Sequence, residues 1–180
     1  SVRKLLTENL STRISEIEKS TEAGPARDQA TGLLFARNGL FGEARRIFER
    51  AIFGEAGAPG GGAAEWGKEL KEETAILLAD LALCITLGAH SRADLDAAAR
   101  YGEAAAEAFP PEAAREKGEL MLKVALVHHL RGDLSAARVW SGKALRLDPA
   151  LGETYRRLMT SEGPVAGLTD EILQFLRQGL

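Results

Sequence analysis

Residues 132–149 read GDLSAARVWSGKALRLDP. Glycine at the first position allows the backbone to reverse with a positive φ, and proline at the last position cannot continue a helix. Between them, Ala137, Trp140 and Ala144 recur at spacings of three and four residues, which places small and bulky side chains on one helical face. This stretch predicts a reversal of the chain, a helix with a closely packed face, and an abrupt stop.

Two other stretches share this pattern. Residues 39–51 read GLFGEARRIFERA, and residues 93–105 read ADLDAAARYGEAA. The aligned small positions are Ala44, Ala98 and Ala137, then Ala51, Ala105 and Ala144, and the aligned bulky positions are Ile47, Tyr101 and Trp140. The alternative is an alanine-rich bundle with chance similarity. The recurring order of helix, turn, helix and stop favours an internal repeat.

The composition predicts an all-α protein. The chain has 180 residues, of which 45% are hydrophobic and 27% are charged, as expected for one globular domain. Alanine and leucine number 56 and valine and isoleucine only 12, which favours helix over strand. We expect helices at about 2–19, 26–38, 42–55, 63–87, 94–109, 112–130, 134–147, 151–161 and 169–178, with Asp94 as an N-cap and a loop at the glycine-rich residues 57–62.

Several functional classes are disfavoured by composition. The net charge of −3 argues against binding of nucleic acid, and no apolar run reaches the roughly 20 residues that a membrane span needs. The single cysteine, Cys84, excludes an internal disulfide. The basic start at residues 1–6 is not followed by the apolar core of a signal peptide. The compartment stays open, with a cytoplasmic location favoured.

The repeat resembles the tetratricopeptide repeat. The third copy carries the strongest match, with Gly132, Ala137, Ala144 and the stop at residues 147–149, and the first copy adds Gly32 and Phe35. The second copy departs from the pattern, with four extra residues in its turn. The helices expected before Ala98 and Ala137 are longer than a repeat of about 34 residues needs, so the resemblance is to the long-helix variety of that family. It covers about residues 26–160 and implies a right-handed superhelix of about three hairpins with a helical cap at each end.

The resemblance also implies a division of the chain and a binding groove. The expected units are a cap (1–20), repeats at 26–56, 63–110 and 111–149, and a partial repeat with a second cap (150–180). In the resembled family the first helix of each hairpin lines the concave side, where partner peptides or helices bind. The matching positions here are Gln29, Leu33, Arg37, Asp80, Leu83, Thr86, Glu119, Leu122, Lys123, Leu126, His129 and Arg156.

This predicted groove alternates leucines with isolated charges, which suits a peptide or an amphipathic helix. Some members of the resembled family hold a terminal carboxylate with lysine and asparagine. Gln29 and Leu33 occupy the matching positions here, so we predict no preference for a terminal carboxylate. For each groove residue the alternative is packing between hairpins or a solvated surface.

The sequence nominates no catalytic, cofactor or metal site. His128 and His129 are adjacent, so on a helix they point about 100° apart and cannot share one ion. His128 matches a position that the resembled family fills with a ring packed between helices. Cys84 lies among leucines and isoleucine, which predicts a buried thiol of raised pKa. The glycine-rich residues 57–62 lack the lysine and serine or threonine of a phosphate-binding loop.

These observations predict a protein that is not an enzyme and that binds a protein or peptide partner, as an adaptor, a co-chaperone or an assembly factor. Under this hypothesis we expect a monomer without cofactors. Two alternatives stay open. The chain could be a self-assembling structural subunit, or a regulatory domain of a larger signalling protein.

Overall fold

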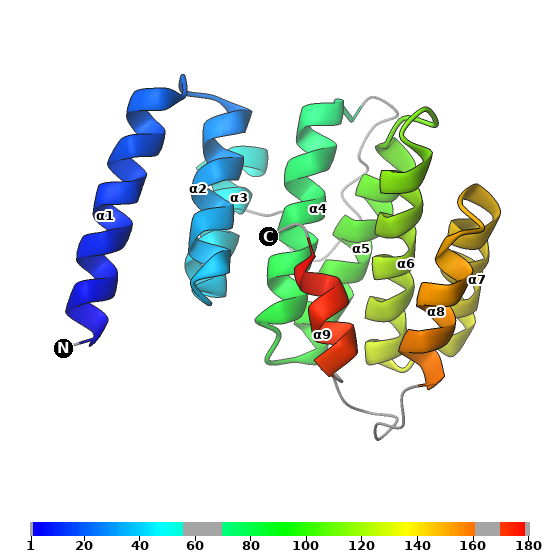
Figure 1. The fold of residues 1–180 in the computed structure, drawn as a ribbon. Coiled ribbons are helices and arrows are strands. Elements are labelled where there is room, and N and C mark those ends of the chain that lie inside the picture. Colours follow the sequence, from blue (N-terminus) through cyan, green and yellow to red (C-terminus); the bar gives the residue numbers. More distant parts are fainter. Residues whose placement is uncertain (1, 56–69, 161–169, 179–180) are drawn as a thin grey trace.

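The computed structural model describes residues 2–55, 70–160 and 170–178, and within these ranges every regular element is an α-helix (Figure 1). The predicted all-α class is therefore confirmed. The predicted glycine-rich loop at 57–62 and the residues 63–69 lie outside the described ranges. The helices are α1 (Val2–Ser20), α2 (Pro25–Arg37), α3 (Phe41–Phe53), α4 (Glu72–Leu87), α5 (Arg92–Ala108), α6 (Ala114–Arg131), α7 (Leu134–Leu147), α8 (Leu151–Thr160) and α9 (Asp170–Arg177).

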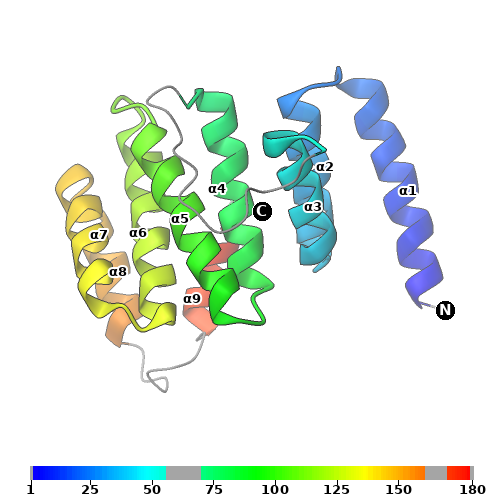
Figure 2. The ribbon, with the colours of Figure 1, turned by 180° about the vertical axis from the view of Figure 1, so that it is seen from behind.

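The helices from α2 to α8 form two layers. Helices α2, α4, α6 and α8 lie on one side, and α3, α5 and α7 lie behind them, as the two opposite views show (Figures 1 and 2). From α2 to α7, each helix packs against the next one along the chain. Helix α1 stands at one end beside α2, whereas α9 packs against α4 on the other side from α5. We call the side formed by α2, α4, α6 and α8 the first-helix face.

Two glycines produce the predicted reversals. Gly39 has φ +74° between α2 and α3, and Gly132 has φ +80° between α6 and α7, a region that side chains with a Cβ rarely adopt. After Gly132, the Asp133 side chain accepts a hydrogen bond from the amide of Ala136 at 3.0 Å and so caps α7. The prediction of a tight turn at these residues is confirmed.

Two predicted helix starts are wrong. Helix α5 begins at Arg92, because the extended Ser91 accepts a hydrogen bond from the Asp94 amide at 3.2 Å and is the N-cap in place of Asp94. The Asp94 carboxylate instead accepts from the amide of His90 at 3.0 Å. Helix α4 begins at Glu72, nine positions after the predicted start, since Lys71 is extended with ψ 146°.

Four of the six aligned small residues are fully buried, whereas Ala51 and Ala137 are half-buried. Ala44, Ala98, Ala105 and Ala144 are each 0% exposed. Gly32 of α2 lies so near the buried Phe48 of α3 that a Cβ at position 32 would be 2.4 Å from the ring. Small side chains at these positions therefore allow helices to approach more closely than larger side chains would permit.

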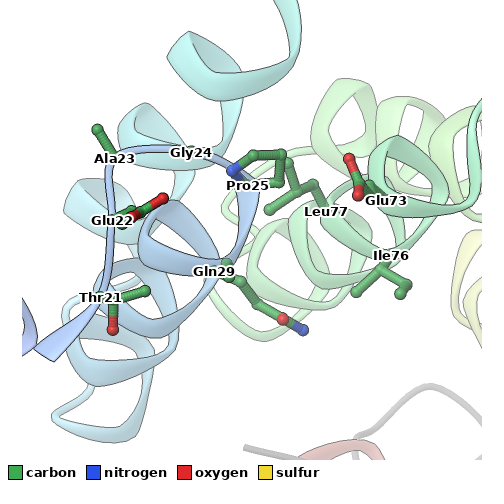
Figure 3. Close-up of a pocket in the computed structure, with 10 residues that line it drawn as sticks. Thr21, Glu22, Ala23, Gly24, Pro25, Gln29, Glu73, Ile76 and Leu77 are labelled. Atoms are coloured by element: carbon green, nitrogen blue, oxygen red, sulfur yellow. The ribbon is translucent and has the colours of Figure 1, made fainter.

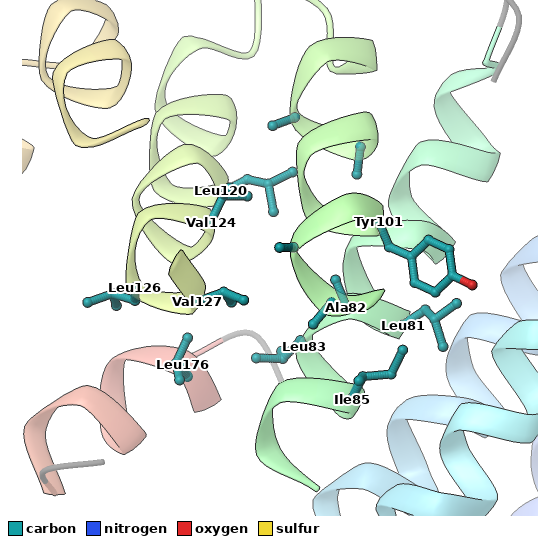
Figure 4. Close-up of a cluster of buried hydrophobic side chains, with 14 of the residues drawn as sticks. Leu81, Ala82, Leu83, Ile85, Tyr101, Leu120, Val124, Leu126, Val127 and Leu176 are labelled. Carbon is teal, nitrogen blue, oxygen red and sulfur yellow. The ribbon is translucent and has the colours of Figure 1, made fainter. Parts of the chain in front are cut away.

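The core centres on α4, α5 and α6 (Figure 4). Helix α4 is buried on most of its circumference, as expected for a helix with neighbours on several sides. Leu78, Leu81, Leu122 and Leu126 are fully buried there. Among the helices in the described ranges, none combines the length and the hydrophobicity needed to cross a bilayer.

Candidate functional site

The predicted groove residues come from helices far apart in the chain, and the structure brings three of them together on the first-helix face. The Gln29 amide nitrogen of α2 donates a hydrogen bond to Asp80 Oδ2 of α4 at 3.0 Å, although the two residues are 51 positions apart. Lys123 of α6 interacts electrostatically with the same carboxylate. We call Gln29, Arg37, Asp80, Glu119 and Lys123 the polar cluster.

Burial shifts the ionisation of this cluster. Burial raises the pKa of Asp80 from 3.8 to about 6, and the hydrogen bond from Gln29 and the charges of Lys123 and Arg37 only partly oppose this rise. Burial likewise lowers the pKa of Lys123, while Glu119 and Asp80 act in the opposite direction. The cluster therefore holds opposite charges, partly removed from water, between three helices of one face.

The apolar members of the predicted groove are more buried than a free groove would allow. Leu122 and Leu126 are 0% exposed and Leu83 is 9% exposed. Thr86 is also buried, and its hydroxyl donates to the carbonyl oxygen of Ala82 at 2.7 Å. In this structure these four side chains pack within the protein, and their role as partner contacts stays a prediction.

The remaining predicted groove residues lie nearer to solvent. Leu33 is half-buried and lines, with Gln29 and the exposed Arg37, a hollow between α1 and α2. His129 is half-buried near the end of α6. Arg156 is exposed on α8 and donates to Glu153 on the same helix at 2.8 Å.

A second hollow lies beside the polar cluster, between the α1–α2 turn and α4 (Figure 3). Pro25 and Gln29 contribute from α2, and Glu73, Ile76 and Leu77 contribute from α4. The sequence analysis did not include these α4 residues, because they precede the positions that the resemblance assigns to the groove. Their apolar and polar side chains extend the candidate surface along the junction of α2 and α4.

Helix α9, expected as part of a C-terminal cap, covers part of the first-helix face. Lys123 Nζ donates to the carbonyl oxygen of Gln178 at 3.0 Å and lies 5.8 Å from the ring centroid of Phe175. Phe175 is 4% exposed and Leu176 is 1% exposed. Phe175 and Gln178 also line a hollow with residues of α6 and α8, including Glu119 and Leu151.

His128 and Cys84 are both buried. His128 is 3% exposed, with Nε2 2.5 Å from Glu103 Oε1 and Nδ1 2.9 Å from an Arg131 nitrogen. Arginine can only donate, so Nδ1 accepts and Nε2 carries the hydrogen that is donated to Glu103. This confirms His128 as a packed ring.

Cys84 is buried, and burial and the Asp80 charge raise its thiol pKa to about 12, so the thiolate is scarce at neutral pH. No group of three or more histidine, cysteine, aspartate and glutamate side chains converges as a metal site within residues 2–55, 70–160 and 170–178.

The fold and the site together define an all-helical protein with a partly buried polar cluster on one face of two helical layers. Comparisons with family models, with curated proteins and with solved structures find no match for this chain.

Proposed function

We propose that this protein is a protein–protein interaction module that binds a peptide or a helix of its partner on the first-helix face. In this proposal the two layers form a right-handed superhelix of about three tetratricopeptide-like hairpins with helical caps. The observation that carries the proposal is the contact of Gln29 with Asp80, beside Lys123. These residues belong to three different helices, α2, α4 and α6, of the first-helix face.

The charges of the polar cluster and the neighbouring hollows would determine which partner the first-helix face binds. Partly desolvated charges discriminate between partners, because a mismatched charge costs more there than in water. The polar cluster would therefore set the register of the partner, and the neighbouring hollows would receive its apolar side chains. The groove gives no reason to assign a catalytic step.

Charge reversal tests this proposal with a partner isolated from the native host and then purified. Arg37→Glu and Glu119→Lys alter charges on α2 and α6 of the first-helix face, and neither side chain belongs to the core. Arg46→Glu and Glu43→Lys are the matched controls, since they make the same two changes of charge at exposed positions of α3, in the other layer.

We expect the two face variants to lose at least about tenfold in affinity while the controls bind as the wild type does. Circular dichroism establishes that all four variants fold. Equal affinity of the face variants and the wild type would contradict the proposal, and so would an equal loss in the controls.

A specific observation favours self-association as the second candidate. The most exposed large apolar side chains in the described part of the chain lie toward the two ends of the helical stack. They are Val2 (84%) and Leu5 (68%) on α1, and Leu134 (51%) and Val139 (54%) on α7. Apolar patches at both ends of a stack would allow copies to join end to end.

Light scattering separates the two candidates. A binding module is expected to be monomeric over a wide range of concentration. A stable oligomer that dissociates in the Val2→Glu, Leu5→Glu double variant would support self-association instead, whereas an oligomer unaffected by this change would exclude the α1 patch as its interface.

A further inference from the structure

The position of α9 indicates what kind of partner the first-helix face accepts. Figure 4 shows Leu176 directed toward Leu83 of α4 and Leu126 of α6, two residues of the predicted groove. Phe175, the adjacent residue, lies against Lys123 of the polar cluster. A segment of the chain itself therefore covers the centre of the predicted groove.

Helix α9 makes two kinds of contact: an apolar pair is buried, and the end of the helix accepts a hydrogen bond. The adjacent Phe175 and Leu176 are almost fully buried, whereas Gln174 and Arg177 on either side are exposed, so the helix is amphipathic. At the C-terminal end of the helix, the Gln178 carbonyl accepts a hydrogen bond from Lys123 Nζ. A cation is favoured at this end, where the last carbonyl groups have no partner in the helix.

We propose that the first-helix face binds an amphipathic helix that carries an adjacent aromatic–leucine pair and ends at Lys123, and that α9 occupies this position in the absence of the partner. This inference rests on the proposed function and specifies its partner. The partner helix buries its aromatic ring beside Lys123 and its leucine between Leu83 and Leu126. Its last carbonyl groups accept from the same lysine.

Occupation by α9 makes the groove selective. A segment tethered to its own binding surface acts at an effective concentration of about a millimolar. A free helix must displace α9, so its apparent affinity falls in proportion to the fraction of molecules with an open face. A partner that matches only the apolar pair, without a C-terminal end for Lys123, competes less well.

The experiment uses a fluorescent peptide of residues 169–180 as the probe and three versions of the full chain. These are the wild type, the double variant Phe175→Ala, Leu176→Ala, and the matched control Gln174→Ala, Arg177→Ala, which alters only exposed positions of α9. We expect the peptide to bind the first variant at least about tenfold more tightly than the wild type or the control. A peptide that carries the same two alanines in place of Phe175 and Leu176 should not bind.

Equal affinity of the peptide for all three chains would overturn the proposal, and so would full binding of the alanine peptide. A wild-type dimer that the first variant converts to a monomer would also overturn it, because α9 would then occupy a second copy.

A second measurement needs no variant. Excess isotope-labelled peptide should accelerate hydrogen exchange of the chain's own α9 amides at least about tenfold, and unchanged exchange would contradict displacement.

These outcomes are distinct from those of the charge-reversal test. Loss of partner binding in the Arg37 and Glu119 variants, together with no binding of the peptide, would leave the proposed function intact and refute the assignment of α9. The opposite result is tight binding of the peptide by the Phe175→Ala, Leu176→Ala variant, with unchanged partner binding by the two charge-reversal variants. It would refute the proposed surface for that partner and support the helix site.

Discussion

Replacing Gly32 by alanine tests a close approach between α2 and α3. A Cβ built at position 32 would lie 2.4, 2.6 and 2.8 Å from three ring atoms of Phe48. Carbon atoms in contact are normally about 3.5–4.0 Å apart, so the overlap is about 1 Å or more. The Phe48 ring is 0% exposed and cannot turn into solvent, so the overlap must be relieved by moving α2 away from α3.

The expected change in the free energy of unfolding for Gly32→Ala follows from two opposing effects. Overpacking a core costs about 1–3 kcal/mol, whereas alanine in place of glycine within a helix contributes about 0.5–1 kcal/mol of stability. We therefore expect Gly32→Ala to lower the free energy of unfolding by about 1–2 kcal/mol. For a chain of this length, thermal unfolding followed by circular dichroism should show a fall in Tm of about 3–6 °C.

The chain offers a matched control for this substitution. Gly142 lies inside α7, and a Cβ there would meet only the end of the Arg146 side chain, at 3.5 Å. Gly142→Ala should therefore raise the free energy of unfolding by about 0.5–1 kcal/mol. A neutral or stabilising effect of Gly32→Ala, measured beside a stabilised Gly142→Ala, would refute the close contact of α2 and α3. Reducing the ring with Phe48→Leu in the Gly32→Ala background should recover part of the loss.

For two further substitutions the structure determines whether the free energy of unfolding rises or falls. Because burial raises the pKa of Asp80 to about 6, its protonated form contributes stability that is present below about pH 4 and is lost as the pH rises through about 6. The free energy of unfolding of Asp80→Asn, measured in urea, should therefore be close to that of the wild type at pH 4 and exceed it by about 1–2 kcal/mol at pH 8. Equal stabilisation at both pH values would contradict the burial of the charge. Gly132→Ala places a Cβ at φ +80° and should lower the free energy of unfolding by about 1 kcal/mol, whereas an unchanged Tm would argue against the left-handed turn.

The sequence predicted helices best where polar caps and strong stops flank them. Helix α7 has the predicted bounds 134–147, because Gly132 and Asp133 precede it and Asp148 and Pro149 follow it. The start of α4 was predicted too early, since alanine and leucine continue the helical pattern across residues 63–71. The acidic pair Glu72 and Glu73 in its first turn was the signal that could have located it.

The candidate site was predictable only in part. The register of the repeat placed Gln29, Asp80 and Lys123 on equivalent helices, and the structure joins the first two directly. The burial of Leu122 and Leu126 was not predictable, because a leucine at a groove position and a leucine in a core have the same local pattern. The apolar pair in α9 likewise indicates that this helix buries one face, but it does not indicate which surface it covers.

Helix α1 is attached by few contacts, so separating it from the fold should cost less free energy than unfolding the central helices. Leu10 of α1 is 7% exposed, and Arg27 of α2 donates to the carbonyl oxygens of Glu18, in the last turn of α1, and of Thr21, just after it. Such a helix can detach without disturbing α4, α5 or α6, because stacked helices are stabilised mainly by their nearest neighbours. Helices α1 and α9 thus differ in what their detachment would uncover: for α1 it is one end of the stack, and for α9 it is side chains of α4 and α6 at its centre.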